Sequence, residues 1–428
     1  MSSPPRPYRV LRHRDYRRFW IAQLVSLTGS QMQVAALHWH VYLLTRSPLA
    51  LGLVGLTRVV PVLVFSLWGG VLADRADRRR LMLATQVALT AVAAALALFT
   101  HAHRETILLL FVLNAVGAAA SAFDGPARQA LVPRLVPREE LQSALALNLT
   151  IFHAAMIGGP AVAGLLLAGA HELADGGAAA TRPLAFIYGL NALSFLAVIL
   201  ALWRMDPAHG RPAAAEGDRH EPALRSLQEG LRFVFGTPLM VWSMALDFFA
   251  TFFSGAMSLL PIFADQVLRA GPRGYGLLVA APAVGALAGS LWTSWQPFGR
   301  RQGRLFLWAV AAYGACTVVF GLSRSFALTF LALAGTGLAD LVSTVVRQTL
   351  RQFVTPDALR GRMTSVNMIF FMGGPQLGEV EAGFVASLFA SAAVGATVSV
   401  VTGGLATIAV AAVVAFATPV LRRYELNA

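Results

Sequence analysis

The sequence predicts an all-α integral membrane protein whose twelve transmembrane helices form two pseudo-symmetric bundles of six, with both termini in the cytoplasm. Three observations predict this fold class: apolar runs of membrane length recur along the chain, arginine gathers in alternate connections, and the second half repeats features of the first. Hydrophobic residues make up 57% of the chain and charged residues only 13%, whereas a soluble domain carries about 25% charged residues. Most of the surface is therefore expected to face lipid.

The spans are apolar runs bounded by charged residues, glycine or proline, each long enough for a membrane helix of roughly 20 residues. They cover 19–44, 49–73, 81–100, 106–123, 143–170, 183–203, 239–266, 275–297, 305–322, 326–353, 363–389 and 396–420. The basic N-terminus does not indicate a signal peptide, because the apolar run after it is too long and no small-residue cleavage site follows.

Arginine sets the orientation. The termini and the connections 2–3, 4–5, 6–7, 8–9 and 10–11 hold nearly all of it. The other side carries Arg46, Arg104, Arg182, Arg269, Arg273 and Arg324. Excess arginine marks the cytoplasmic side, so both termini are predicted inside, as an even number of spans requires. The net charge of +13 is scattered over short connections, which excludes the contiguous basic face of a nucleic-acid-binding protein.

Three parts are expected along the chain: a first six-helix bundle over 1–203, a cytoplasmic linker over 204–238 and a second bundle over 239–428. The first part of the linker, 206–222, is rich in proline, alanine, glycine and charge and is typical of a flexible connection. Its second part, 224–235, has apolar residues at helical spacing and Arg225, Glu229 and Arg232 on another face. This pattern predicts an amphipathic helix at the membrane surface.

The two halves share a repeat. Residues of the first half recur in the second at one constant offset: Arg128, Gln129, Pro137 and Asn148 as Arg347, Gln348, Pro356 and Asn367. A second set, Ser66-Leu67-Trp68 and Leu81, recurs as Ser290-Leu291-Trp292 and Leu305. Repeated halves place the substrate site of many transporters at their interface, near the middle of the bilayer.

The connection between the second and third spans carries a dense motif, Gly70-Val-Leu-Ala-Asp74-Arg75-Ala-Asp77-Arg78-Arg79-Arg80. Its pattern G-x-x-x-D-R-x-x-R-R resembles the signature loop of the major facilitator superfamily of transporters. With twelve spans and the repeat, the resemblance covers nearly the whole chain. Within the superfamily, the stretches 69–75, 224–233 and 360–363 are similar to the bacterial enterobactin-exporter and macrolide-efflux branch.

This resemblance implies a cytoplasmic gate, formed by Gly70, Asp74, Arg75, Arg78, Arg79 and Asp124. Asp74 is expected against the positively polarised N-terminus of helix 11. Arg78 is expected to bridge to Asp124, which is placed at the cytoplasmic end of helix 4. Static packing of these residues is the alternative.

Helix 5 carries Gly159, Pro160 and Gly164, and helix 11 carries the cognate Gly374, Pro375 and Gly378. The helix 5 pattern is similar to a motif associated with antiporters, although Ala155 and Ala163 replace two expected glycines. The resemblance therefore implies export. Close helix packing explains the same glycines, since small residues let helix backbones approach in a membrane.

Ionisable residues inside spans are costly and are functional candidates by default. Arg58 on helix 2 and Glu379 and Glu381 on helix 11 all fall in the outer half of the bilayer, which predicts an outer gate. The two glutamates point to different sides of their helix, so one can pair with Arg58 while the other titrates. Asp340, near the centre of helix 10, is the predicted proton carrier, because burial favours a protonated carboxyl group. A glutamate is the rival carrier, and structural ion pairs or snorkelling are the plainer alternatives.

Polar and aromatic residues on cavity helices are the candidates for substrate contact: Gln31, Gln33, Asn114, Asp247, Phe248 and Phe252. Lipid contact or core packing is the better explanation for at least half of the phenylalanines in this stretch. His38 and His40 splay apart on a helix, so no metal site is predicted. The single cysteine, Cys316, excludes a disulfide framework, and no cofactor is expected.

These features predict a monomeric secondary exporter in the bacterial cytoplasmic membrane, in which protons flow inward while an amphiphilic small molecule, such as a siderophore or drug, leaves by alternating access. ATP is not the direct energy source, because no G-x-x-x-x-G-K-[ST] loop is present. A lysophospholipid flippase or nutrient importer of the same fold is the alternative. An importer of sugars or anions would show several polar cavity residues, and this chain shows mostly apolar ones. An enzyme or a transport-dead receptor is the remote alternative, because neither a catalytic set nor a soluble sensor domain is evident.

Overall fold

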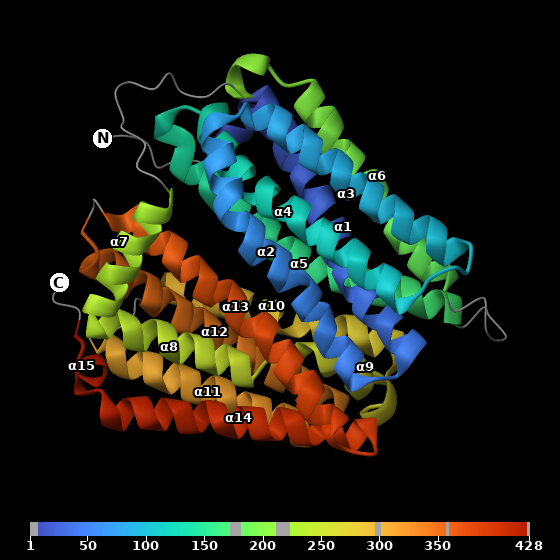
Figure 1. The fold of residues 1–428 in the computed structure, drawn as a ribbon, viewed down its shortest axis with the longest axis vertical. Helices are drawn as coiled ribbons and strands as arrows, with labels where there is room; N and C mark the ends of the chain where they lie inside the picture. Colours follow the sequence, from blue (N-terminus) through green and yellow to red (C-terminus); the bar gives the residue numbers. More distant parts are fainter. Residues whose placement is uncertain (1–6, 172–180, 211–222, 296–300, 357–358, 426–428) are drawn as a thin grey trace. The chain divides into compact units, whose positions relative to one another are not determined.

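The computed structural model describes residues 7–171, 181–210, 223–295, 301–356 and 359–425. Every regular element in these ranges is a helix (Figure 1). The chain divides into two compact units: unit 1 comprises Met1–Val41 and Val60–Arg219, and unit 2 comprises Tyr42–Val59 and His220–Ala428. A short piece of the N-terminal half of the sequence, Tyr42–Val59, thus groups with the C-terminal half.

Unit 1 is built on six long helices, of which the first two also extend into unit 2. They are α1 (Arg14–Thr45), α2 (Pro48–Arg75), α3 (Arg78–His101), α4 (Ile107–Leu135), α5 (Leu141–His171) and α6 (Arg182–Trp203), with the short 3₁₀ helices η1 (Pro7–Arg12), η2 (Arg138–Glu140) and η4 (Pro207–Gly210). Asp77 begins α3 as its N-cap, where its carboxylate accepts the backbone N–H of Arg80 at 3.1 Å. Thr106 caps α4 in the same way, through the N–H of Leu109. Such caps satisfy backbone donors that the helix leaves free.

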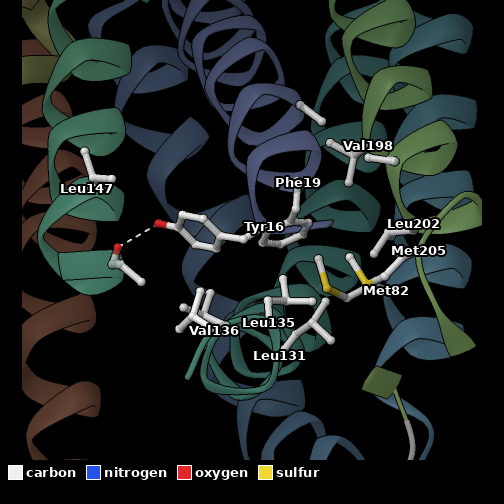
Figure 2. Packing of buried hydrophobic residues seen from close by; sticks show 14 of the residues in the cluster. Tyr16, Phe19, Met82, Leu131, Leu135, Val136, Leu147, Val198, Leu202 and Met205 are labelled. Atoms are coloured by element: carbon white, nitrogen blue, oxygen red, sulfur yellow. Dashed lines mark hydrogen bonds between the residues drawn. The ribbon is translucent and has the colours of Figure 1, made fainter. Parts of the chain in front are cut away.

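The best-defined core of unit 1 joins five of its helices (Figure 2). Tyr16 and Phe19 of α1, Met82 of α3, Leu131 of α4 and Leu202 of α6 are all buried there. The hydroxyl of Tyr16 donates to the carbonyl of Ala144 in α5 at 2.9 Å, so its one polar group is satisfied. Since lipid is as apolar as these side chains, close packing and hydrogen bonds hold such a bundle together more than the hydrophobic effect does.

The C-terminal part of unit 2 begins with the amphipathic helix α7 (Ala223–Gly236), which packs on α8 and α13 and buries Val234. The remaining elements are α8 (Pro238–Phe253), η5 (Ala256–Leu259), α9 (Leu260–Ile262), the π helix η6 (Phe263–Val267), α10 (Gly271–Trp295), α11 (Gln302–Leu322), α12 (Phe326–Val354), α13 (Arg360–Ser387), α14 (Ala392–Ala417) and α15 (Pro419–Arg422). The seventh expected span is therefore broken after Phe253. At the break, the backbone of Gly255 lies directly against that of Gly378 in α13.

The helix packing repeats between the units. In unit 1, α3 packs against α6 and α4; in unit 2, α11 packs against α14 and α12. These are the third, sixth and fourth long helices of each half of the sequence. The sequence repeat thus corresponds to two similarly packed bundles.

Ten helices of the described chain are long and apolar enough to cross a membrane. They correspond to ten of the twelve expected spans. The other two, α1 and α13, have 32 and 28 residues, so they are long enough but more polar. They carry several candidate functional residues, including Gln31, Gln33, Glu379 and Glu381. The count of twelve and the cytoplasmic location of the termini stay predictions.

Candidate functional site

A buried charge cluster connects α8 and α12 in unit 2. The guanidinium of Arg347 forms an ion pair with the carboxylate of Asp247, and these two side chains are only 6% and 8% exposed. A second carboxylate, that of Asp340, lies 4.0 Å from the same guanidinium and is 48% exposed. Arg351, one turn beyond Arg347, interacts electrostatically with Asp247 as well. One guanidinium is therefore shared between a buried and an accessible acid.

The accessible acid faces a hollow inside unit 2. Asp340, Asp247 and Tyr313 line it, together with Thr251 and Ser343, so the walls come from α8, α11 and α12. The hollow is small, with about 10 Å³ of space open to a water-sized molecule, roughly enough for one water. The sequence placed Asp340 and Asp247 in separate roles; the structure brings both to one cavity. A carboxylate beside such a hollow can be reached by water and protons.

Unit 1 offers an internal comparison. Arg128 of α4 is the repeat partner of Arg347, and its guanidinium donates to the side-chain oxygen of Gln23 in α1 at 3.3 Å. In both units, an arginine of the fourth helix thus reaches the first helix of its half. The partner is a neutral amide in unit 1 and a carboxylate in unit 2. The ionisable site is therefore a specialisation of the second copy.

The other candidate cavity residues take part in contacts within their own units. In α1, Gln31 donates to the sulfur of Met156, and Gln33 accepts from the side-chain amide of Asn191 at 2.8 Å. Asn114 is half-buried in α4. In unit 2, the ring of Phe248 stacks on that of Phe252, with centroids 6.0 Å apart, and meets Phe370 edge-on. The phenylalanines thus form an aromatic surface on α8 towards α13.

The glycines of α5 and α13, the fifth and eleventh expected spans, lie where backbones approach closely. A Cβ at Gly159 would lie 2.5 Å from the Cβ of Gln31 and 2.8 Å from the carbonyl of Thr28, so α5 meets α1 there. A Cβ at Gly374 would meet Thr251 and the backbone of Phe248, and one at Gly378 would meet the backbone of Phe252. Pro160 and Pro375 lie inside the same helices, and Gly164 is buried. The contact of α5 with α1 thus has a counterpart in the contact of α13 with α8.

The first half of α2 packs on α13 within unit 2. A Cβ at Gly55 would lie 2.6 Å from a carboxylate oxygen of Glu379, and one at Gly52 would meet the backbone of the same residue. Arg58, less than one turn beyond Gly55, interacts electrostatically with Glu379. Of the two glutamates expected near Arg58, Glu379 is therefore the one on the α2 side of α13. Glu381 is half-buried on the same helix.

The signature loop holds helix ends of unit 1 together. Arg79 donates to the last carbonyls of α6, those of Leu202 at 2.6 Å and Trp203 at 2.9 Å, and Arg78 donates to the carbonyl of Ala130 in α4. A cation at a helix C-terminus also complements the negative end of the helix dipole. Gly70, Asp74 and Arg75 belong to the last turns of α2, in the stretch 66–75, whose side chains are outside the described residues.

Asp124 differs from its expected place. It was placed at the cytoplasmic end of helix 4 as the partner of Arg78, but α4 continues to Leu135. Asp124 is therefore buried well inside the helix, where its carboxylate accepts from Thr85 at 3.0 Å and from Gln86 at 2.9 Å. Because α3 and α4 are consecutive and pack against each other in opposite directions, the start of α3 lies near the end of α4. Arg78 therefore donates to the carbonyl of Ala130 and not to Asp124. The sequence held one indication of this contact: Thr85 and Gln86 are adjacent polar residues inside the apolar run 81–100.

The histidines of α1 each contact their own surroundings: His38 lies 3.0 Å from the carbonyl of Val34, and His40 lies 3.2 Å from the hydroxyl of Tyr188. Within the described ranges, His, Cys, Asp and Glu form no group of three that could hold a metal ion.

With the bundles and the charge cluster defined, comparison with known proteins identifies the class. The sequence model of a family of the major facilitator superfamily, the transmembrane secretion effectors, matches residues 5–426. The chain therefore belongs to that family. It is 27% identical over 354 residues to the enterobactin exporter EntS of Shigella boydii serotype 18, covering 83% of this chain and 81% of that protein. The exporter of the same name from Escherichia coli O81 is similar to the same extent.

Solved transporter structures share the fold. One is a bacterial homologue of the human lysosomal transporter Spinster, in an inward-facing and occupied conformation, with a TM-score of 0.73, 15% identity and full coverage of both chains. Another is a POT family transporter in complex with 5-aminolevulinic acid, with a TM-score of 0.73, 12% identity and coverage of 95% of this chain and 96% of that one. The chain is thus a membrane transporter of the major facilitator type. The family match, the similarity to enterobactin exporters and the membrane-length helices confirm the expected multi-pass protein of the bacterial cytoplasmic membrane.

Proposed function

We propose that this protein is a proton-driven exporter of an amphiphilic small molecule, such as a siderophore, and that it works by alternating access as a monomer. The observation that carries the proposal is the sharing of the buried guanidinium of Arg347 between Asp247 and Asp340 at one hollow. The similarity to enterobactin exporters favours export and a siderophore-like substrate.

Asp340 is proposed as the proton carrier. When its carboxyl group is ionised, Arg347 is attracted towards both acids; when it is protonated, the guanidinium is left to Asp247 alone. Proton binding therefore changes the charge balance between α8 and α12 without leaving Arg347 unpaired. Opposite charges at such short range stabilise each other strongly in a medium of low polarity, so a single proton has a large local effect.

Two gates complete the proposed cycle. On the outer side, Arg58 and Glu379 are proposed to hold α2 to α13. On the cytoplasmic side, Asp74 and its loop are proposed to hold the gate through the N-terminus of α13, as the superfamily resemblance implies. Asp124 is not proposed again as the partner of Arg78, because it lies well inside α4 and accepts from Thr85 and Gln86, while Arg78 donates to the carbonyl of Ala130.

The test uses inverted membrane vesicles containing the protein, with enterobactin as the first probe and a set of amphiphilic drugs and lysophospholipids as further probes. An inside-acid pH gradient should drive uptake, and a protonophore should abolish it. Asp340→Asn should lose gradient-driven uptake but retain exchange of labelled for unlabelled substrate. Ser121→Asn, at the repeat-equivalent position of α4, is the matched control and should behave as wild type.

Uptake that is unaffected by the protonophore would contradict proton coupling. If Asp340→Asn couples normally while Glu379→Gln or Glu381→Gln loses its dependence on the gradient, the proton carrier lies on α13 instead. Transport of lysophospholipid alone would favour the flippase alternative.

A further inference from the structure

A second polar cluster lies in unit 2, where α1 ends, and its residues are not part of the gates above. We call Tyr42, Arg46, Asp265 and Gln266 the outer cluster. Tyr42 donates its hydroxyl hydrogen to the carboxylate of Asp265, and Arg46 donates to the same carboxylate at 2.7 Å. Arg46 also donates to the hydroxyl oxygen of Tyr42 at 2.6 Å, and the side-chain amide of Gln266 donates to it at 3.1 Å.

These contacts use the whole hydrogen-bonding capacity of one hydroxyl group. A tyrosine hydroxyl has one hydrogen to donate and can accept two hydrogen bonds, and Tyr42 makes all three here. The guanidinium of Arg46 also lies over the ring of Tyr42, 4.5 Å from its centroid, in the geometry of a cation–π contact. The outer cluster is thus a connected hydrogen-bond network rather than a chance surface ion pair.

The backbone on both sides of the outer cluster is unusual. Arg46 has a φ of 52°, which lies in the left-handed region. At the end of a helix, this conformation is usually adopted by glycine. Asp265 and Gln266 lie in the π helix η6, a form that is rare and is often found at functional sites. Residues with a side chain persist in such conformations only when their surroundings enforce them. Two uncommon backbone features meet in one hydrogen-bond network.

The segment Tyr42–Val59, which carries Tyr42 and Arg46, is bounded by the two divisions between the compact units. The two compact units divide inside α1, between Val41 and Tyr42, and inside α2, between Val59 and Val60. Pro61 lies next to the second division, within α2, and a proline inside a helix removes a hydrogen bond and favours a kink. Beyond the outer cluster, the segment touches α13 through glycines, Gly52 against Gly383.

The exposure of the outer cluster suits repeated opening. The side chains of Arg46 and Asp265 are 55% and 36% exposed, so water can solvate both groups when the contact breaks. Exposed ion pairs contribute little to stability, whereas breaking a buried pair leaves an unsolvated charge. An interaction that must form and break in every transport cycle is best built in this way.

We propose that the outer cluster is a releasable latch, which holds the α1–α2 connection to the π helix η6 and opens when the transporter exposes its substrate site to the outside. The proposal rests on the alternating-access cycle proposed above, but not on the nature of the substrate or of the driving ion. The left-handed backbone of Arg46 and the π helix η6 orient the side chains of Arg46 and Asp265 towards each other.

The test measures a distance, not transport. In a Cys316→Ala background, Leu49→Cys on α2 and Leu277→Cys on α10, both exposed, carry spin labels, and the distance distribution is recorded by pulsed electron–electron double resonance in nanodiscs without substrate or gradient. Arg46→Gly, Asp265→Asn and Tyr42→Phe should each raise the ratio of long to short distances. We expect up to about a fivefold change for the first two, since exposed charged pairs contribute about 1 kcal/mol or less.

The chain offers a matched control. Arg269 is also an exposed arginine with left-handed backbone, at a φ of 51°, on the same predicted face of the membrane. Arg269→Gly should leave the distances unchanged, and the exchange of Arg46→Asp with Asp265→Arg should restore the short distance. If Tyr42→Phe, Arg46→Gly and Asp265→Asn all give the distribution of Arg269→Gly, the latch is refuted. That result would leave proton-driven export in vesicles untouched, and a failure of proton coupling would leave the latch standing.

Discussion

Arg347 of α12 and Asp247 of α8 form an ion pair in which each side chain is more than nine-tenths buried. Their positions are a hundred residues apart in the sequence, and the contact exists only because α8 and α12 lie in one bundle. Removing one partner of a buried pair leaves the other as an unpaired charge, at a cost of about 3–5 kcal/mol, while replacing both with apolar residues is often neutral.

We therefore expect Arg347→Ala to lower the midpoint of thermal unfolding in detergent strongly and to reduce the yield of folded protein. Arg347→Met combined with Asp247→Leu should recover most of that loss. Arg128→Ala is the matched control, because Arg128 donates to the neutral Gln23 and its removal strands no carboxylate. If Arg347→Ala and Arg128→Ala lower the midpoint of thermal unfolding equally, the buried ion pair contributes no more to stability than the neutral contact does.

The glycines of helix 5 allow a sharper test of close packing. Gly159 and Gly158 are neighbours, but a Cβ at Gly159 would collide with α1, whereas a Cβ at Gly158 meets nothing within 4 Å. Overpacking of this kind costs about 1–3 kcal/mol. Gly159→Ala should thus lower thermal stability while Gly158→Ala should not, as read by fluorescence-detected size exclusion after heating. A loss of stability in Gly158→Ala alone would contradict the packing geometry.

Composition and the apolar runs were enough to predict the helices, because a membrane helix is specified by length and hydropathy. Where the sequence misled, tertiary packing decided. The run Asp124-Gly-Pro126 indicated an end to helix 4, yet α4 continues through Pro126 and Pro133. The continuation is packed into the core of unit 1 through Leu131 and Leu135.

The candidate site could be foreseen in part only. Asp247, Asp340 and Arg347 stood out as charges inside spans, but their association depends on which faces of α8 and α12 meet, and no local pattern encodes that. The outer cluster gave a weaker signal. Arg46 was one of the few arginines on the outer side, while its partner Asp265 lies in a π helix that a continuous apolar run did not reveal.

The position of Asp124 inside α4 predicts that its contribution to thermal stability depends on Gln86 and not on Arg78. Asp124→Ala leaves the side-chain amide of Gln86 without its acceptor, whereas Thr85 can still donate to the carbonyl of Met82. An unsatisfied buried polar group costs about 1–3 kcal/mol. A double-mutant cycle on thermal stability should show coupling between Asp124→Ala and Gln86→Leu. The cycle of Asp124→Ala with Arg78→Ala should be additive within about 0.5 kcal/mol, as for sites without a shared contact. Strong coupling in the second cycle would restore the bridge that the superfamily resemblance implied.

The contact of α2 with α13 predicts which glutamate serves the outer gate. Glu379 lies against Gly55 and interacts with Arg58, and Glu381, two residues on, points to another side of the helix. Arg58→Glu and Glu379→Arg should each impair transport in vesicles, because each places two like charges next to one another. The combination of the two should recover part of the activity, since it restores an opposite pair.

The combination of Arg58→Glu with Glu381→Arg is the matched control and should recover nothing. Both double variants carry the same net charge, so a general electrostatic effect predicts equal recovery, and only a specific contact separates them. Recovery with Glu381→Arg but not with Glu379→Arg would mean that α13 turns its other face to α2 during transport. In that case Glu379 would become the candidate for proton binding, because it would be the acid left without Arg58.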